Sequence, residues 1–408
     1  MNAEWLAYPF LFIAIFFESF VLVTLLSKPA RNARTRVKGA YTPRVAVVVP
    51  CWNEAGTVGS TCESLLALDY PKDKLEIILV NDGSTDATAQ IMDSFRYEPQ
   101  VRVIHKKNGG KHTALNAGIA ATTAEIVGCL DADSFVEPSA LREIIPCFDH
   151  PNVAAATGAM SVYEPKTIIQ HAQNVEYVFG ITLRHAIASI NGLYVTPGPF
   201  SFYRMSTLQE LGGFRHGHQT EDMEMALRIQ EAGYEIENAP RARVYTKAPA
   251  TVSLLVKQRT RWTSGFLRNI LGEYRGLIGR KGALGMLMLP TALISIASGI
   301  LLFGLVIFQT ISHALTAFEL RAGVPLAYSL FPHYSFDWFY APAGVYAFLA
   351  AIAIVFSFFL VFMGKRISKT PGNIGIGILF YILYGLVIPL WLIRATVNVA
   401  LGTKKAWR

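Results

Sequence analysis

Carboxylate side chains follow apolar runs of the sequence, at positions where buried strands would end. Asp131 and Asp133 come directly after the apolar run 126–130, and Asp222 follows much later, in the triplet 220–222. An Asp-X-Asp pair at a strand end can bring two carboxylates to one divalent cation, Mg²⁺ or Mn²⁺, which then binds a diphosphate. A later isolated acid can accept the proton of an attacking hydroxyl. The combination predicts group transfer from a diphosphate-linked donor to a hydroxyl.

Short apolar runs alternate with helical patterns between residues 44 and 130, which predicts a mostly parallel sheet covered by helices on both faces. We expect strands over 45–49, 75–80, 101–104 and 125–130 and helices over 58–68, 85–95 and 111–121. Ligands bind such sheets at the carboxyl ends of the strands. The polar residues that follow these strands are therefore expected at one edge of the sheet; they are Pro50, Asn53, Glu54, Asp82, Asp131 and Asp133.

Each motif also has a purely structural interpretation. An isolated Asp-X-Asp is more often a turn, but three strands that deliver acids to one edge favour a site. Asp222 could simply complement the positive end of a helix that we expect Thr220 to cap. Lys111, at a helix start, suits a phosphate. Its loop lacks the glycine and the hydroxyl residue of a nucleoside triphosphatase motif, because His105 and His112 stand there.

Arg261 and Trp262 belong to the segment Gln258 to Trp262 and allow two interpretations. They could form an interfacial pair beside a membrane span. We favour the functional interpretation, in which the indole stacks on a sugar and the guanidinium binds a diphosphate oxygen. The surrounding stretch, 241–281, holds ten basic residues against one acid. That excess suits anionic lipid headgroups or a nucleotide diphosphate, whereas no nucleic-acid-binding motif is present.

The chain is too apolar for an ordinary soluble protein, with 52% hydrophobic and 16% charged residues in 408. The surplus predicts four membrane spans, over 8–27, 284–308, 341–363 and 374–397. Six basic and no acidic residues between 28 and 44 place the following domain in the cytosol. There the four cysteines are expected to stay reduced. Glu18 and Arg394 lie within spans; they either contact each other, or Arg394 reaches toward an interface.

Together these residues resemble the family 2 inverting glycosyltransferases, and among them the membrane-bound cellulose, chitin, hyaluronan and poly-N-acetylglucosamine synthases. The resemblance implies a glycosyltransferase A type α/β fold that binds the metal through Asp131 and Asp133 and uses Asp222 as the base. It implies that Asp82 contacts the nucleotide base, and it matches Gln258, Arg261 and Trp262 to the family's Gln-X-X-Arg-Trp motif. We expect the nucleotide at Pro50, Asn53, Glu54, Asp82, Lys111, Asp131 and Arg261, and the acceptor at Glu221, Gln258 and Trp262.

On this basis we expect an anchor over 1–28, a cytosolic catalytic domain over 43–247, interface helices over 248–283, membrane helices over 284–398 and a basic tail over 399–408. Two features depart from the family pattern: Asn81-Asp82 replaces paired aspartates, and no clear gating loop is found. Three spans after a cytosolic domain would also place the basic tail outside, against the charge rule, unless one apolar segment does not cross.

The expected protein is an integral protein of the inner or plasma membrane that extends a polysaccharide or oligosaccharide, with UDP-N-acetylglucosamine as first and UDP-glucose as second donor. Its partners would be membrane lipids, a saccharide or lipid-linked acceptor and, at most, accessory export subunits. The alternatives are an enzyme that adds one sugar to a lipid and a silent scaffold or pore.

Overall fold

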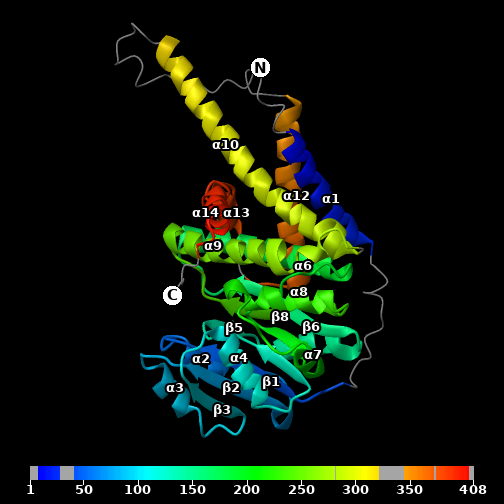
Figure 1. Ribbon diagram of the computed structural model, residues 1–408, viewed down its shortest axis with the longest axis vertical. Coiled ribbons are helices and arrows are strands. Elements are labelled where there is room, and N and C mark those ends of the chain that lie inside the picture. Colours follow the sequence, from blue (N-terminus) through cyan, green and yellow to red (C-terminus); the bar gives the residue numbers. More distant parts are fainter. Residues whose placement is uncertain (1–7, 28–40, 281, 321–343, 372–373, 404–408) are drawn as a thin grey trace.

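The computed structural model describes residues 8–27, 41–280, 282–320, 344–371 and 374–403. Within these residues eight strands form one sheet in the order β3-β2-β1-β4-β7-β6-β8-β5 (Figure 1). Their bounds are β1 Val45–Cys51, β2 Leu75–Asp82, β3 Val101–Lys106, β4 Ile126–Cys129, β5 Ser134–Val136, β6 Val153–Val162, β7 Ser201–Arg204 and β8 Glu235–Thr246. The four strands predicted from the apolar runs are all present, each within two residues of its expected bounds.

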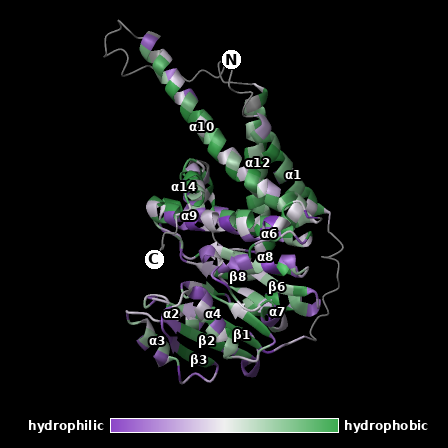
Figure 2. Ribbon diagram, viewed as in Figure 1, coloured by the Kyte–Doolittle hydropathy of each residue, from purple (hydrophilic) through white to green (hydrophobic). Residues whose placement is uncertain are grey.

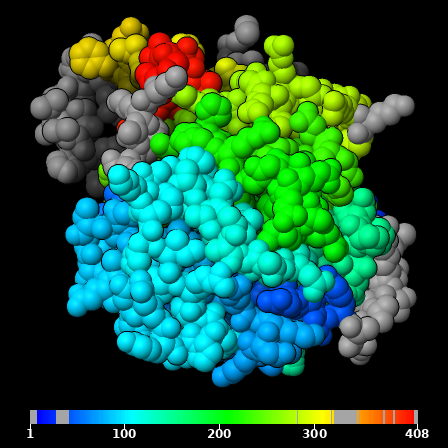
Figure 3. Space-filling view, turned by 60° about the horizontal axis from the view of Figure 1, so that its bottom comes forward, coloured from blue at the N-terminus to red at the C-terminus, as the bar shows by residue number. Residues whose placement is uncertain are grey.

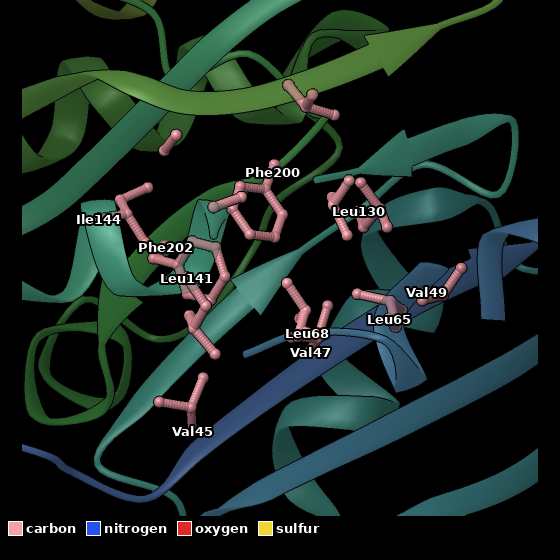
Figure 4. Packing of buried hydrophobic residues seen from close by; sticks show 14 of the residues in the cluster. Val45, Val47, Val49, Leu65, Leu68, Leu130, Leu141, Ile144, Phe200 and Phe202 are labelled. Carbon is pink, nitrogen blue, oxygen red and sulfur yellow. The ribbon is translucent and has the colours of Figure 1, made fainter. Parts of the chain in front are cut away.

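The first half of the sheet is parallel, as the alternating pattern predicts, since β1 pairs with both β2 and β4 and β2 pairs with β3. Successive side chains of β1 enter two different cores: Val45, Val47 and Val49 join one, and Ala46 and Val48 join the other. This is why the strand is apolar at every position. Figure 4 shows the first core, where these valines meet residues of α2, α5 and β7.

The second half of the sheet is mixed. Strand β7 runs antiparallel to β4 and β6, and β5 runs antiparallel to β8, whereas β6 and β8 are parallel. Strand β5 starts at Ser134, directly after the Asp-X-Asp residues, so the chain turns between β4 and β5 and both carboxylates lie in that turn. In the space-filling view the blue-to-cyan part of the chain lies directly against the green part (Figure 3).

Helices cover both faces of the sheet. One face is covered by α2, α3 and α5 and the other by α4, α7 and α8. Their bounds are α2 Val58–Leu66, α3 Thr88–Ser94, α4 Lys111–Ala120, α5 Ala140–Ile144, α7 Met205–Glu210 and α8 Glu221–Glu231, with short 3-10 turns at η2 Lys72–Lys74, η3 Ile145–Asp149 and η4 Gly217–Gln219.

A layer of helices separates the sheet from the apolar helices. It consists of α6 Ile168–Ser189 and α9 Val252–Arg268, which continues into a π-helical turn η5 Asn269–Glu273 and the turn η6 Arg275–Leu277. From this layer α1 Tyr8–Leu26, α12 Val345–Ser368 and η7 Leu284–Met288 with α10 Leu289–Leu320 extend away from the sheet (Figure 1). Figure 2 shows that these helices are mostly hydrophobic. Among the described residues they supply the three helices long and apolar enough to cross a membrane.

The fourth predicted span differs from expectation. Residues 374–397 are divided between α13 Gly375–Tyr384 and α14 Ile388–Ala400. Helices of 10 and 13 residues are too short to cross a hydrocarbon core of about 30 Å. They pack instead along the intermediate layer, α13 on α6 and α14 on α9. Figure 1 shows both almost end-on, across the direction of α10 and α12.

Close packing explains why α13 can lie on α6. Gly377 sits against the His171 carbonyl, where a Cβ would meet that oxygen at 2.5 Å. Helix α12 joins the same layer through Thr182, whose hydroxyl donates to the Leu360 carbonyl at 2.7 Å. The apolar stretch is therefore used as a cover for α6 and α9. Hydropathy alone does not distinguish this arrangement from a span, because both bury the same side chains.

The hydrogen bond of the Glu18 side chain goes to Ser357 and not to Arg394. The Glu18 carboxylate accepts a hydrogen bond from the Ser357 hydroxyl of α12. This bond joins the first and third candidate spans. The predicted basic run between 28 and 44 and the end of the basic tail, 404–408, lie largely outside the described residues.

Candidate functional site

A cleft of about 570 Å³ opens at the carboxyl ends of β1, β2 and β4, where the sequence predicts the site. Most of the predicted nucleotide-binding and metal-binding residues line it; these are Pro50, Glu54, Asp82, Lys111, Asp131, Asp133 and Arg261. Trp52, His112, His216 and Gln219 also line it and were not predicted. Trp52 stands in the same strand-end segment as Pro50 and Asn53, which is the signal that would have identified it.

Asp82 fixes the glycine loop that forms one wall of the cleft. Its side chain is buried and accepts hydrogen bonds from the backbone N–H of Gly109 (3.0 Å) and Gly110 (2.9 Å) and from the Lys106 ammonium (2.6 Å). Gly110 has a φ of 92°, a conformation that favours glycine. Both carboxylate oxygens of Asp82 are thus engaged with the loop, so its first effect is to shape the cleft.

Asn53 does not line the cleft, but its hydrogen bonds stabilise the loop at the edge of the cleft. It adopts a left-handed conformation with φ of 55°, and its amide oxygen accepts a hydrogen bond from the Thr85 backbone N–H at 2.8 Å. Its own backbone N–H donates to the Ser84 hydroxyl at 3.0 Å. These bonds tie the end of β1 to the loop after β2, which orders the segment that carries Trp52 and Glu54.

Lys111 lies at the centre of the cleft between two carboxylates. Its ammonium is 2.5 Å from Asp131 Oδ1 and 3.0 Å from Glu221 Oε1. Lys111 begins α4, Asp131 follows β4 and Glu221 begins α8, so three segments distant in sequence meet at one positive charge. This places Lys111 beside the Asp-X-Asp carboxylates, as a phosphate partner would be.

Asp133 is a buried carboxylate close to two other carboxylates. Burial, and then the nearby carboxylates of Asp131 and Glu54, raise its pKa to about 6. Apart from the neighbouring Ser134 hydroxyl at 3.1 Å and a longer contact to Thr246, no other group donates to it in the described residues. The described residues contain no cluster of three or more ligand side chains for a metal ion. Mg²⁺ and Mn²⁺ are commonly held by one or two carboxylates together with substrate phosphates, so Asp131 and Asp133 fit such an ion.

Asp222 faces a second cavity, of about 610 Å³, which extends from the cleft toward α6, α9, α13 and α14. Its Oδ1 accepts a hydrogen bond from the Met223 backbone N–H (2.8 Å), and its Oδ2 accepts one from Gly198 (3.1 Å). Burial, followed by the charge of Glu221, raises the pKa of Asp222 to about 6. Loss of hydration thus outweighs the effect of the helix N-terminus on this pKa, but with a pKa of about 6 the carboxylate is still mostly ionised at neutral pH.

Thr220 does not cap α8 through its side chain, contrary to the prediction. Its hydroxyl donates to the Gly217 carbonyl at 2.7 Å and accepts from the Asn269 amide at 3.1 Å. Gly265 of α9 lies against Thr220, where a Cβ would meet the Thr220 side chain at 2.5 Å or closer. Close contact with α9 therefore fixes the turn that positions Glu221 and Asp222.

We expect Gly265→Ala to lower the melting temperature. The added methyl group collides with Thr220, and overpacking of this kind costs about 1–3 kcal/mol. That exceeds the gain of up to about 1 kcal/mol from replacing a helical glycine. Thermal unfolding checks this, and Gly265→Ala combined with Thr220→Ala should recover part of the loss. An unchanged melting temperature in the single variant would contradict this packing.

The predicted Gln-X-X-Arg-Trp residues divide between the two cavities. Arg261 lines both, and its guanidinium donates to the Gln219 carbonyl at 2.8 Å. Gln258 and Trp262 line the second cavity and not the cleft. The Trp262 ring has the Arg259 guanidinium 4.3 Å from its centroid, and Arg259 is itself held by Glu176 at 2.8 Å. Arg259 was not predicted, although its position inside the motif and its charge beside Trp262 were visible in the sequence.

Known proteins resemble this chain in sequence. A family model described as "Glycosyltransferase like family 2" matches residues 43–265. Poly-beta-1,6-N-acetyl-D-glucosamine synthase from Staphylococcus epidermidis is 33% identical over 240 residues, which is 58% of this chain and 58% of that protein. The enzyme of the same name from Staphylococcus aureus strain COL is 31% identical over 239 residues, 56% of each chain. This chain thus aligns with somewhat more than half the length of these relatives.

A solved structure has a similar fold along nearly the whole chain. It is a mannosyltransferase from Pyrobaculum calidifontis, with a TM-score of 0.59 and 19% identity, and the match covers 95% of this chain and 99% of that one. At this identity the likeness shows the fold alone. With the family match, it confirms the predicted glycosyltransferase A type α/β fold.

Proposed function

The chain belongs to glycosyltransferase family 2, and we propose that it is a membrane-embedded inverting β-glycosyltransferase that extends a polysaccharide or oligosaccharide. The observation that carries the proposal is that the cleft and the second cavity share five residues, namely Lys111, Asp131, Asp133, Glu221 and Arg261. A donor in the cleft and an acceptor in the cavity would therefore meet at the Asp-X-Asp carboxylates, with Asp222 on the acceptor side.

The donor is proposed to be UDP-N-acetylglucosamine, with UDP-glucose second. The names of the relatives from Staphylococcus support an N-acetylglucosamine polymer. In this assignment the nucleotide lies in the cleft near Trp52 and the loop that Asp82 holds. The diphosphate lies toward Lys111 and Arg261, whose positive charges stabilise the charge that develops as the sugar leaves.

The proposed reaction is a single displacement. The acceptor hydroxyl oxygen forms a bond to the anomeric carbon from the face opposite UDP, while the bond between that carbon and the UDP oxygen breaks. Asp222 accepts the hydroxyl proton, and UDP leaves with the electron pair of the broken bond. The hydrogen bonds from Gly198 and Met223 hold the Asp222 carboxylate in place as it accepts the proton.

A divalent cation is part of this proposal. Asp131 and Asp133 would hold it, and it would supply positive charge at the diphosphate. The solved mannosyltransferase of similar fold is described in complex with GDP-mannose and Mn²⁺. Lys111 already contacts Asp131. When the ion binds, either the Lys111 ammonium would move together with this carboxylate, or the ammonium and the ion would both contact it.

We propose that the three candidate spans are the helices that cross the membrane. One span before the catalytic domain and two after it return the chain to the cytosolic side, provided that α13 and α14 lie at the interface. The basic residues of the tail, 404–408, would then also be cytosolic. This agrees with the charge rule, which four spans would violate.

The test of the function is a panel of labelled nucleotide sugars supplied to the purified protein in lipid, with the products analysed by mass. The proposal predicts repeated addition from UDP-N-acetylglucosamine. A single addition would favour a lipid-modifying transferase, and no addition from any donor would favour a scaffold. Either result would overturn polysaccharide extension.

The rate of transfer is expected to fall in mild acid. Because the pKa of Asp222 is raised to about 6, the base becomes protonated at a higher pH than an ordinary aspartate. The single-turnover rate at saturating donor should be constant above about pH 7 and fall roughly tenfold per unit below about pH 6. Donor binding measured at each pH separates this loss from protonation of Asp133. A rate that stays constant from pH 7 to pH 5 would contradict the assignment.

A further inference from the structure

The second cavity contains a positive charge that the proposed reaction does not use. Arg184 of α6 lines this cavity, and its Nε and Nη2 atoms are buried without a hydrogen-bond partner in the described residues. Burial lowers its pKa to about 10, so it still carries its charge at neutral pH. A buried charge without a partner is destabilising. The cavity is thus suited to an anionic or strongly hydrogen-bonding group.

Glu176 on the same helix raises the pKa of Arg184 through its charge, against the larger effect of burial, but its hydrogen bonds go to other residues. Glu176 pairs with Arg259 at 2.8 Å and accepts a hydrogen bond from the Tyr384 hydroxyl at 2.8 Å. Space for the guanidinium is provided by Gly180, one turn earlier, where a Cβ would stand 3.0 Å from Nη1 of Arg184. The arginine is therefore accommodated in the cavity wall and left available to a ligand.

A third, mostly apolar cavity of about 400 Å³ adjoins the second one. The two share Leu183, Tyr194, Met223 and Trp262 as lining residues, and Leu183 directly precedes Arg184 in α6. The other walls of the apolar cavity come partly from two candidate membrane spans. Phe17 belongs to α1, and Thr291, Ala292, Ser295 and Ile296 belong to α10. The apolar cavity therefore lies between the second cavity and two candidate membrane spans.

We propose that the acceptor is a saccharide linked through a phosphate or diphosphate to a lipid chain, and that it enters from the membrane. This proposal rests on the proposed function, because it concerns the acceptor of that same site. The phosphate pairs with Arg184, the first part of the chain lies in the apolar cavity, and a saccharide hydroxyl reaches Asp222. The phosphate itself does not react. We choose this acceptor because three parts of the structure lie in a matching order: the polar catalytic site, then the buried Arg184, then the apolar cavity.

The test compares three synthetic acceptors with the same N-acetylglucosamine disaccharide. The first carries a diphosphate and a farnesyl-length chain, the second the same chain through a neutral ether, and the third the diphosphate with a methyl group. We expect KM for the first to be at least about tenfold lower than for each of the others, since charge-assisted hydrogen bonds and chain burial each contribute binding.

Two variants assign the effect to the proposed residues. Arg184→Gln should raise KM for the diphosphate acceptors about tenfold and leave KM for the ether acceptor unchanged, whereas Arg184→Lys should retain part of the preference. Ser295→Phe, which fills the apolar cavity, should remove the preference for the long chain. The matched controls are Arg142→Gln, at an exposed ion pair with Asp69, and Val306→Phe, at a half-exposed position of α10.

The outcomes separate this inference from the function on which it rests. If the wild-type protein uses all three acceptors with similar KM, or if Arg184→Gln acts equally on the charged and neutral acceptors, the lipid-phosphate site is wrong and the transfer reaction stands. A neutral saccharide without a chain that competes equally well leads to the same conclusion. If no donor gives transfer to any acceptor, the proposed function itself fails.

Discussion

Asp222→Asn is expected to transfer sugar about 10³-fold more slowly than the wild-type protein, because the amide cannot accept the proton of the acceptor hydroxyl. The substitution preserves the shape of the side chain, and its oxygen can still accept the hydrogen bond from Gly198. Asp222 lines the second cavity, which we assign to the acceptor, and not the cleft. The dissociation constant of the UDP-sugar should therefore stay within about threefold of the wild-type value.

Single-turnover transfer at saturating donor measures the rate, and calorimetric titration with UDP measures binding. Asp73→Asn, at an exposed position on the turn η2, is the matched control and should behave as wild type. Normal transfer by Asp222→Asn would show that another group is the base. If the variant loses both UDP binding and transfer, the substitution disturbs the whole site.

Asp133→Asn is expected to have a comparable effect on transfer by a different route. Burial and the nearby carboxylates of Asp131 and Glu54 raise the pKa of Asp133, and removing its charge removes part of the negative charge that would hold a divalent cation. We expect transfer to fall at least about 10³-fold and UDP binding to lose its dependence on Mg²⁺ or Mn²⁺, because the cation contributes several kcal/mol of charge stabilisation.

This prediction is measured as UDP affinity with and without the metal, in the wild-type protein and in the variant. The wild-type protein should bind UDP much more weakly after chelation and recover with either ion. Asp133→Asn should bind equally weakly in both conditions. A chelated wild-type protein that transfers sugar at its full rate would contradict a metal-dependent reaction.

The sequence was informative about the first half of the sheet. Each strand there is apolar at successive positions, because the sheet is buried on both faces. In β1, for example, alternate side chains enter two separate cores. The polar residue that follows each such strand could therefore be placed at one edge. Asp82, Asp131 and Asp133 line one cleft for that reason.

Contacts between distant segments were not accessible in the same way. Arg184 is one of the charged residues of α6, and the absence of hydrogen-bond partners for its Nε and Nη2 atoms among the described residues is a property of the packed structure. The raised pKa of Asp222 likewise depends on burial, which the helix-start pattern does not reveal. The segment 374–397 has the hydropathy of a span, but the break between α13 and α14 and their packing on α6 and α9 give it another place.

The assembly of donor and acceptor groups around the Asp-X-Asp carboxylates is tested most directly by an experimental structure with a non-transferable phosphonate analogue of UDP-N-acetylglucosamine and Mg²⁺. The diphosphate should lie against Asp133, Lys111 and Arg261, and the sugar should point into the cavity that contains Asp222. An analogue bound outside the cleft, or with its anomeric carbon directed away from Asp222, would contradict the account.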